Sequence, residues 1–245
     1  MKKLISFLSI CLLFVSQINA QIDQLDSEII KTNNGDLEIV FVAHGSLIFI
    51  YQDQHIYIDP SMRSGFSYDN MPKADLVIIT HEHGDHYDPK TLEKIVTEDT
   101  KYISTQLVFD YLNKGEVMNN GDQADLFGFN ITAVPAYNIE RKRSNGKPFH
   151  AKGVGNGYVF TFGITKIYVA GDTEFIPEMK ELEDIHIAFL PMNLPYTMKP
   201  EEVANAAKAF KPRILYPYHY GKTNTQELID LMKDQQFTKV IIKKM

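Results

Sequence analysis

Hydrophobic runs separated by short polar breaks dominate the first third of the chain. Residues 37–43, 47–51 and 55–59 are rich in Ile, Val, Phe and Tyr, and three mostly polar residues separate each run from the next. This pattern predicts a meander of β-strands. Residues 75–80 form a further, mostly apolar run that predicts a buried strand.

Helical spacing begins after this strand. Pro89 opens a segment that carries Leu92, Ile95 and Val96 at helical intervals, which predicts a helix over 89–98. Further helices and strands are then expected in alternation; the helices cover 105–113, 176–183, 200–210 and 225–234, and the strands lie within 123–136 and over 157–163, 166–172, 185–191, 213–217 and 239–243. The order predicts one domain whose sheets are covered by helices on their outer faces.

The first twenty residues differ from the rest of the chain. Lys2 and Lys3 precede an apolar run over 4–15, and a polar stretch follows and ends in Ala20. This order predicts a cleaved secretory signal peptide over 1–20. A membrane anchor is the alternative, but the run of about a dozen residues is shorter than the roughly 20 that span a bilayer. We therefore expect a single mature domain over 21–245, periplasmic or secreted, without stable membrane insertion.

Composition narrows the chemistry. Hydrophobic residues make up 44% of the chain and charged residues 23%, as in ordinary globular proteins. The net charge is −6 without a basic stripe, so we expect no nucleic-acid partner and instead a small-molecule substrate. The single cysteine, Cys11, lies in the predicted leader, so a mature chain would hold metal through nitrogen and oxygen. The oligomeric state is left open.

Titratable side chains crowd the end of the strand at 75–80. "THEHGDH" supplies His81 and His83, two residues apart, which point the same way on an extended chain. Gly84 permits a sharp turn that brings Asp85 and His86 round to the same point. Imidazole and carboxylate suit zinc first, with manganese or iron as alternatives. Four such groups on one loop favour two neighbouring divalent ions over one.

Two later strand ends carry matching groups. Asp172 ends "KIYVAGD", where Gly171 leaves room for close approach, and His219 follows "ILYPY". Alone, each would be an ordinary turn or loop residue. With the first motif present, we expect both to be metal ligands.

These motifs together resemble a known group of proteins. "THEHGDH", "AGDT" and "PYHYG", in this order and spacing, are similar to the metallo-β-lactamase-fold superfamily of metal-dependent hydrolases. "AHGSLIFIYQDQHIYIDP", with His44 and Asp59, and "PMNLPYTM" resemble the branch that includes ascorbate-6-phosphate lactonase. The resemblance implies an α/β (α+β) fold, a four-layer αββα sandwich. It also implies two metal ions: His81 and His83 hold the first, Asp85, His86 and His219 hold the second, and Asp172 bridges them.

One position departs from the pattern of the superfamily. A third histidine for the first metal is usual on the loop that here reads "TAVPAYN", where this chain has Tyr137. His150, thirteen residues further on, is the preferred replacement. The alternative is that Tyr137 or water fills the gap, although a phenol loses its proton only near pH 10.

The loop around His150 is basic in an acidic protein. It carries Arg141, Lys142, Arg143, Lys147 and Lys152. It is either a solvated surface loop or a funnel that attracts an anionic substrate to the metals.

A mechanism follows for a dinuclear site. Two close metals supply hydroxide at neutral pH, and Asp85 would orient it and take its proton. We expect Asp59 to hold a ligand histidine, His44 to donate to substrate, and Tyr196 to edge the pocket. The sequence thus predicts an exported metal-dependent hydrolase of a small anionic ester, lactone or phosphoester. The alternatives are a non-catalytic metal- or ligand-binding protein with a degraded site, and an amide hydrolase of the β-lactamase type.

Overall fold

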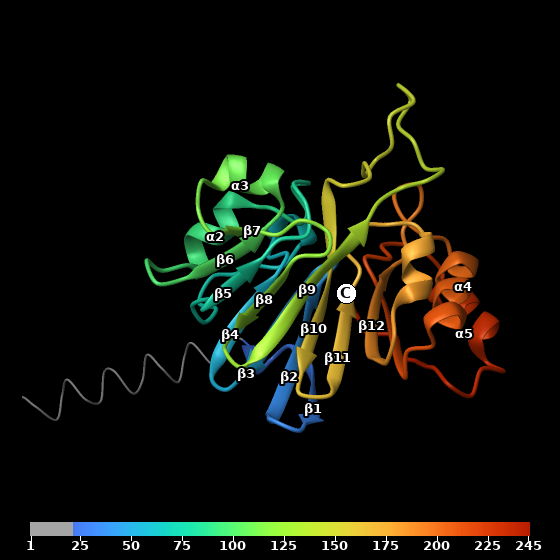
Figure 1. Cartoon of the computed structure of the whole chain (residues 1–245), viewed down its shortest axis with the longest axis horizontal. Coiled ribbons are helices and arrows are strands. Elements are labelled where there is room, and N and C mark those ends of the chain that lie inside the picture. Colours follow the sequence, from blue (N-terminus) through green and yellow to red (C-terminus); the bar gives the residue numbers. More distant parts are fainter. Residues whose placement is uncertain (1–21) are drawn as a thin grey trace, which may run out of the picture.

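Two mixed β-sheets packed face to face form the centre of the molecule, and helices cover their outer faces (Figure 1). The computed structural model describes residues 22–245. Each sheet has seven strands, and each begins as an antiparallel meander and continues with parallel strands. Within 22–245, none of the helices has the length and apolar character needed to cross a membrane.

The first sheet contains the seven strands from the N-terminal half. Their order in the sheet is their order in the chain: β1 (Asp26–Thr32), β2 (Gly35–Ala43), β3 (Ser46–Tyr51), β4 (Gln54–Ile58), β5 (Leu76–Ile78), β6 (Lys101–Ser104) and β7 (Glu116–Val117). The connections between the parallel strands contain η1 (Met62–Ser64), α2 (Pro89–Ile95) and α3 (Gln106–Leu112). Helix α2 starts where the Asp88 side chain caps the Lys90 amide and Pro89 takes the first helical position.

The second sheet mirrors this arrangement. It contains β8 (Gln123–Leu126), β9 (Phe129–Ala136), β10 (Gly155–Phe162), β11 (Thr165–Val169), β12 (Ile185–Pro191), β13 (Ile214–Tyr218) and β14 (Lys239–Val240). Its outer face is covered by η2 (Pro177–Glu181), α4 (Pro200–Phe210) and α5 (Thr225–Met232). All candidate ligands except His150 follow parallel strands of the two sheets, at the carboxyl ends where α/β folds place their sites.

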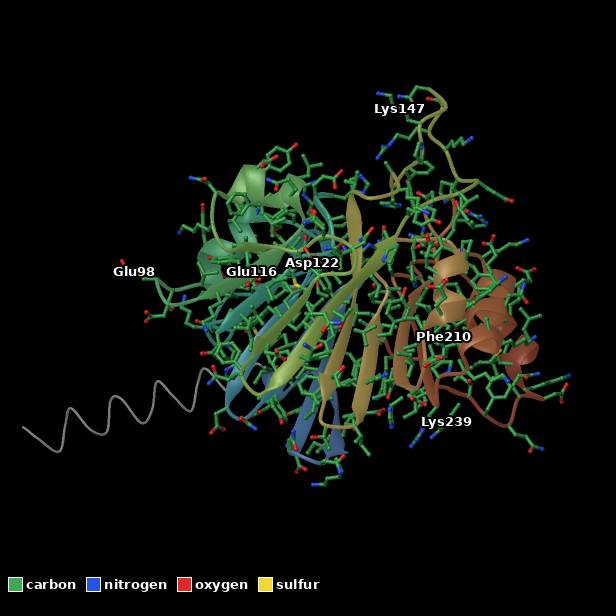
Figure 2. The ribbon with its side chains drawn as sticks, viewed as in Figure 1. Glu98, Glu116, Asp122, Lys147, Phe210 and Lys239 are labelled. Carbon is green, nitrogen blue, oxygen red and sulfur yellow. The ribbon has the colours of Figure 1, made fainter. Side chains whose placement is uncertain are left out.

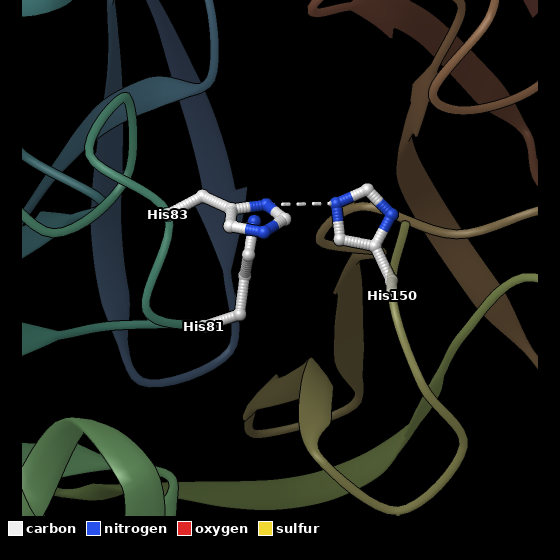
Figure 3. A group of neighbouring side chains, drawn as sticks. All are labelled: His81, His83 and His150. Carbon is white, nitrogen blue, oxygen red and sulfur yellow. Dashed lines mark hydrogen bonds between the residues drawn. The ribbon is translucent and has the colours of Figure 1, made fainter. Parts of the chain in front are cut away.

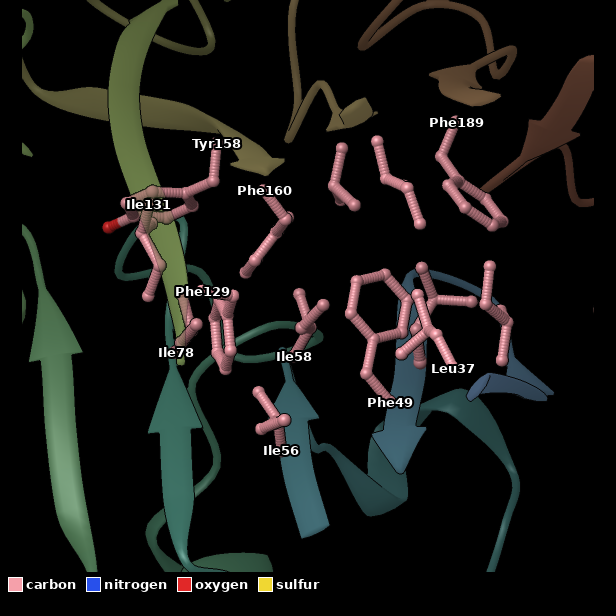
Figure 4. Packing of buried hydrophobic residues seen from close by; sticks show 14 of the residues in the cluster. Leu37, Phe49, Ile56, Ile58, Ile78, Phe129, Ile131, Tyr158, Phe160 and Phe189 are labelled. Atoms are coloured by element: carbon pink, nitrogen blue, oxygen red, sulfur yellow. The ribbon is translucent and has the colours of Figure 1, made fainter. Parts of the chain in front are cut away.

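Apolar side chains from both sheets interlock between the layers (Figure 4). Phe49 from β3 meets Phe160 from β10 edge to face, with ring centroids 5.2 Å apart. Ile48, the next residue along β3, belongs instead to the cluster beneath α2 and α3. Because successive side chains of a strand point to opposite faces, the continuous apolar runs serve two cores at once.

The predicted elements agree with the structure at most positions. The meander over 37–59 is confirmed, and the helix predicted over 200–210 has those bounds as α4. The helix predicted over 176–183 is instead the short 3₁₀ helix η2, which Pro177 opens. Strand β1 was missed, although the two-residue turn before Gly35 is a hairpin signal. Strand β6, four residues long, was also missed.

Candidate metal centre

The loop after β5 folds back on itself to gather its histidines. The amides of His86 and Tyr87 both donate to the carbonyl of His83, at 2.9 and 2.8 Å. Thr80 anchors the start of the loop, because its amide donates to Asp59 Oδ1 at 2.7 Å and its carbonyl accepts from Asn156 N at 2.9 Å. The loop is therefore tied to both sheets.

The ligand candidates from the second sheet meet this loop through close backbone contacts. Gly171, before Asp172, has φ +63°, and a Cβ there would lie 2.7 Å from the carbonyl oxygen of Asn156. His219 and His44 also have positive φ, 50° and 56°, and the His219 amide donates to the His44 carbonyl at 2.9 Å. Such backbone conformations are uncommon outside glycine and concentrate at functional sites.

Seven side chains meet in one cluster, together with His44. The nitrogen and oxygen atoms that could bind metal lie within 4.8 Å of one another in each of three groups, of which the first two share His81: His81, His83 and His150; His81, His86 and Asp172; and His44, Asp85 and His219. His150 Nε2 lies 3.1 Å from His83 Nδ1, as Figure 3 shows, and 3.2 Å from Asp172 Oδ2. The structure thus brings together every candidate ligand named from the sequence, His150 included.

Neighbouring polar groups select the tautomers of three histidines. Asp59 Oδ2 accepts from the Thr80 hydroxyl at 2.6 Å and from His86 Nδ1 at 2.7 Å. The Thr80 oxygen can then accept from His81 Nδ1, 2.9 Å away. Asn138 Oδ1 likewise faces His150 Nδ1 at 2.9 Å. Each ring therefore presents an Nε2 lone pair, which is what a metal-binding imidazole needs.

The unpaired atoms of the cluster fit divalent metal ions. Within 22–245, four of its buried polar atoms have no hydrogen-bond partner: His81 Nε2, His86 Nε2, Asp172 Oδ1 and His219 Nδ1. Buried polar atoms are otherwise almost always paired. Neutral imidazoles and carboxylates are common zinc ligands. The residues present therefore fit the metal that the motif predicted.

The electrostatics of the cluster also favour a bound cation. Burial by itself raises the pKa of Asp172, but His219 and His86 outweigh it and hold that pKa well below its ordinary value. Burial lowers the pKa of His86, but Asp172 and Asp59 outweigh it and raise that pKa to about 10. Burial, with the charge of His86 beside it, holds the pKa of His81 well below its ordinary value. Buried carboxylates thus attract a positive charge that a metal ion can supply in place of a proton.

The Tyr137 hydroxyl has partners outside the cluster, which favours His150 as the third ligand of the first metal site. That hydroxyl donates to Glu178 Oε2 at 3.0 Å and accepts from Lys152 Nζ at 3.2 Å. The chain returns to the cluster through His150, whose amide donates to Asn138 Oδ1 at 2.7 Å. Asn138 had no recognisable signal in the sequence, because its role depends on this return of the loop.

The basic loop is not the broad funnel that its composition suggested. Arg141 pairs with Glu174 at 3.3 Å and Glu202 at 2.6 Å, and Lys152 pairs with Glu178 at 2.8 Å. Lys147 sits at the tip of the loop, away from the body of the molecule (Figure 2). Of the five basic residues, Arg143 lines the pocket beside the cluster.

An open pocket of about 440 Å³ gives access to the cluster. His44 and Asp85 line it, with His44 Nε2 3.2 Å from Asp85 Oδ2 and the His44 ring centroid 3.7 Å from that of His219. Tyr196 and Phe149 form an aromatic wall, with ring centroids 5.0 Å apart. Phe149 was not anticipated from the sequence. Pockets of this size suit small molecules.

Known proteins share both the sequence and the fold. Residues 38–219 match the family model described as the beta-lactamase superfamily domain. A UPF0173 metal-dependent hydrolase from Nanoarchaeum equitans is 30% identical over 192 residues, which cover 76% of this chain and 84% of that protein. A crystal structure from Parabacteroides distasonis, named as a metal-dependent hydrolase, is 44% identical with a TM-score of 0.85, covering 90% of this chain and 99% of that one.

A more distant structure shows how far the fold extends. Igni18, a metallo hydrolase from Ignicoccus hospitalis, superimposes with a TM-score of 0.70 at 24% identity, over 85% of this chain and 95% of that one. The predicted αββα sandwich is therefore confirmed. With residues 38–219 matched and a relative 30% identical over most of its length, the chain belongs to the metallo-β-lactamase superfamily, within the UPF0173 family of metal-dependent hydrolases.

Proposed function

We propose that this hydrolase uses two divalent metal ions to cleave a small anionic ester, lactone or phosphoester. The observation that carries the proposal is the position of Asp172. Its Oδ2 lies 3.2 Å from His150 Nε2 and 3.5 Å from His219 Nε2, and its Oδ1 lies 3.5 Å from His86 Nε2. The Asp172 carboxylate therefore lies next to the ligands proposed for the first ion and next to those proposed for the second. It is the one proposed ligand that is assigned to both ions.

The ligands divide into two sets around Asp172. His81, His83 and His150 would hold the first ion, and Asp85, His86 and His219 the second. Zinc is the metal we propose, because all of these ligands are imidazole or carboxylate. When bound, two such ions lower the pKa of a water molecule and polarise the substrate oxygen that gains charge.

Asp85 and His44 would handle protons and substrate at the open side of the cluster. The Asp85 side chain is 38% exposed, against 4% for that of Asp172, so Asp85 is the carboxylate that solvent reaches more readily. We assign Asp85 Oδ2 to orient the attacking water and hold its proton. His44 Nε2, 3.2 Å from that oxygen and facing the pocket, would donate to the substrate.

The substrate class rests on the pocket and on sequence resemblance. Arg143 lines the pocket. The histidines and aspartates that line it in the described chain belong to the metal cluster, so Arg143 is the cation that could contact an anionic substrate. "AHGSLIFIYQDQHIYIDP" and "PMNLPYTM" resemble the ascorbate-6-phosphate lactonase branch, which supports a lactone or phosphoester that carries an anionic group.

We also propose that the enzyme acts in the periplasm or outside the cell. The support is the predicted signal peptide over 1–20, which lies outside the described residues. N-terminal sequencing of the protein from the native cell tests it: a start at Gln21 is expected, and a start at Met1 in the cytoplasmic fraction would contradict it.

Metal content and hydrolysis together test the function. Elemental mass spectrometry of the mature wild type should give about two ions per chain, falling toward one in His150→Ala. His186→Ala is the matched control, because this half-buried histidine bonds to the Asp184 carbonyl outside the cluster. A panel of anionic lactones, esters, phosphoesters and β-lactams then identifies the reaction. Two ions with no hydrolysis of the first three classes would contradict the proposal, and cleavage of β-lactams alone would replace it.

A further inference from the structure

Arg63, from the short helix η1, lies beside the loop that carries His81 to His86. Its guanidinium packs against the backbone of Gly84, because a Cβ built at Gly84 would lie 2.0 Å from Arg63 Nη1. Gly84 itself lines the pocket. A Cβ at position 84 would clash with the Arg63 guanidinium in its present position. The glycine of "HEHGDH" therefore makes room for Arg63 as well as permitting the turn.

Arg143 reaches the preceding residue from the opposite half of the chain. Its Nη2 lies 3.0 Å from His83 Nε2 and donates to the Phe149 carbonyl at 3.3 Å. Its guanidinium carbon also lies 5.1 Å from the centre of the Phe149 ring. Arg143 therefore has a defined position over His83.

Neither of the two arginines has an acidic partner in the described part of the chain. Among residues 22–245, no carboxylate oxygen lies within 4.0 Å of either guanidinium, whereas Arg141 and Lys152 of the same basic loop both pair with glutamates. The two cations lie against adjacent residues, His83 and Gly84. Positive charge without a paired carboxylate at this place favours an anion there.

The chemistry of His83 leads to the same requirement. The ring faces His150 Nε2 with its Nδ1 and Arg143 with its Nε2. An imidazole that ligates through Nδ1 carries its proton on Nε2 and cannot accept a hydrogen bond there. When His83 serves as a ligand, Arg143 loses this acceptor and keeps the Phe149 carbonyl, so its remaining N–H groups are available to an anion.

We propose that Arg63 and Arg143 form a two-arginine clamp that binds the carboxylate or phosphate group of the substrate at the rim beside His83 and Gly84. The clamp rests on the proposed function and specifies it further: the anionic group is recognised by the arginines, apart from the bond that is broken. Guanidinium groups match both oxyanions with paired hydrogen bonds. The aromatic wall of Phe149 and Tyr196 borders the same pocket and would contact the rest of the molecule.

Anion binding to the metal-loaded protein tests the clamp directly. Inorganic phosphate and succinate are titrated separately by calorimetry into wild type, Arg63→Gln, Arg143→Gln and the double variant, with metal content and melting temperature checked for each. We expect each single loss to weaken binding about ten- to a hundredfold, since charged hydrogen bonds are lost. Arg143→Lys should recover part of the affinity, because it keeps the charge without the fork. The anion that binds with the higher affinity, phosphate or succinate, indicates which group the substrate carries.

Lys147→Gln is the matched control, because this exposed cation of the same loop lies at its tip (Figure 2). Its affinity for both anions should equal that of the wild type. The clamp is overturned if the double variant binds both anions as tightly as the wild type, or if the wild type binds neither. Failure of the proposed function is a separate result: anion binding would follow the arginines while the substrate panel remained uncleaved.

Discussion

Two loops build the metal pocket in opposite ways. The loop after β5 places four ligand candidates within six residues, and His81 and His86 are only 3% and 0% exposed. The loop between β9 and β10 instead projects from the body of the molecule and contributes His150 near its return (Figures 1 and 2). The first loop is buried or half-buried along its length, whereas the second is mostly solvent-exposed between its two ends.

Buried polar anchors explain how the projecting loop still positions His150. Glu174 is 3% exposed, and its carboxylate accepts from the amides of Glu140 and Arg141 at 3.0 and 2.7 Å and from Asn138 Nδ2 at 3.2 Å. Asn138 in turn holds His150. Both loops are therefore held at their bases by buried hydrogen bonds. They differ in solvent exposure at their tips. We infer that the loop after β5, the compact loop, supplies most of the metal ligands, whereas the projecting loop supplies His150 and borders the substrate pocket with Arg143 and Phe149.

Asp172→Ala should have the largest effect, because Asp172 contacts ligands from both loops. We expect hydrolysis to fall by about 10³-fold or more, as several kcal/mol of metal-derived stabilisation is lost. Elemental mass spectrometry should show both ions depleted. Loss of only one ion would show that the two loops form independent metal sites, and it would contradict the role of Asp172 as a ligand shared by both.

Asp59→Ala tests the compact loop. The substitution leaves the Thr80 amide, the Thr80 hydroxyl and His86 Nδ1 without their acceptor inside the core. We expect a loss of about 3 kcal/mol in the free energy of unfolding, and metal affinity weaker by about 10- to 100-fold. Urea unfolding and metal titration measure these effects. Asp53→Asn is the control at an exposed turn and should change neither, because Asn tolerates the positive φ of 61° at this position.

Glu174→Gln tests the base of the projecting loop. The amide retains the shape of the carboxylate but loses its charge for Arg141, 3.3 Å away. We expect about 1–2 kcal/mol of destabilisation and weaker binding of the ion that His150 holds, with the other ion unchanged. Equal loss of both ions would mean that the two loops do not act separately.

Substitutions at the tip should have the smallest effect. Lys142→Gln and Asn145→Ala change exposed residues, and we expect the free energy of unfolding to stay within about 0.5 kcal/mol of wild type. Metal content should remain that of the wild type. A clear loss of metal in either variant would show that the tip, and not only Glu174 and Asn138, holds His150 in place.

Local patterns predicted much of this molecule. The strands of the meander and helix α4 follow from periodicity, because apolar spacing reports directly on which face is buried. The elements that were missed or changed are short or lie at a surface, where the pattern is weak; they are β1, η1, β6, β7 and η2. The "HEHGDH" motif could be read because its ligands are neighbours in the sequence.

Contacts between distant segments required the tertiary structure. Tyr137 and His150 were both candidates in the sequence, and only the path of the loop carries the Tyr137 hydroxyl to Glu178 and His150 to His83, 67 residues away along the chain. Arg63 had no signal at all, because its place over Gly84 depends on how η1 packs against the compact loop. By itself the sequence determined the elements, the metal-binding residue types and one local cluster. The fold decided which loop residues face the metals, since long-range contacts follow from the packing of the two sheets rather than from any local pattern.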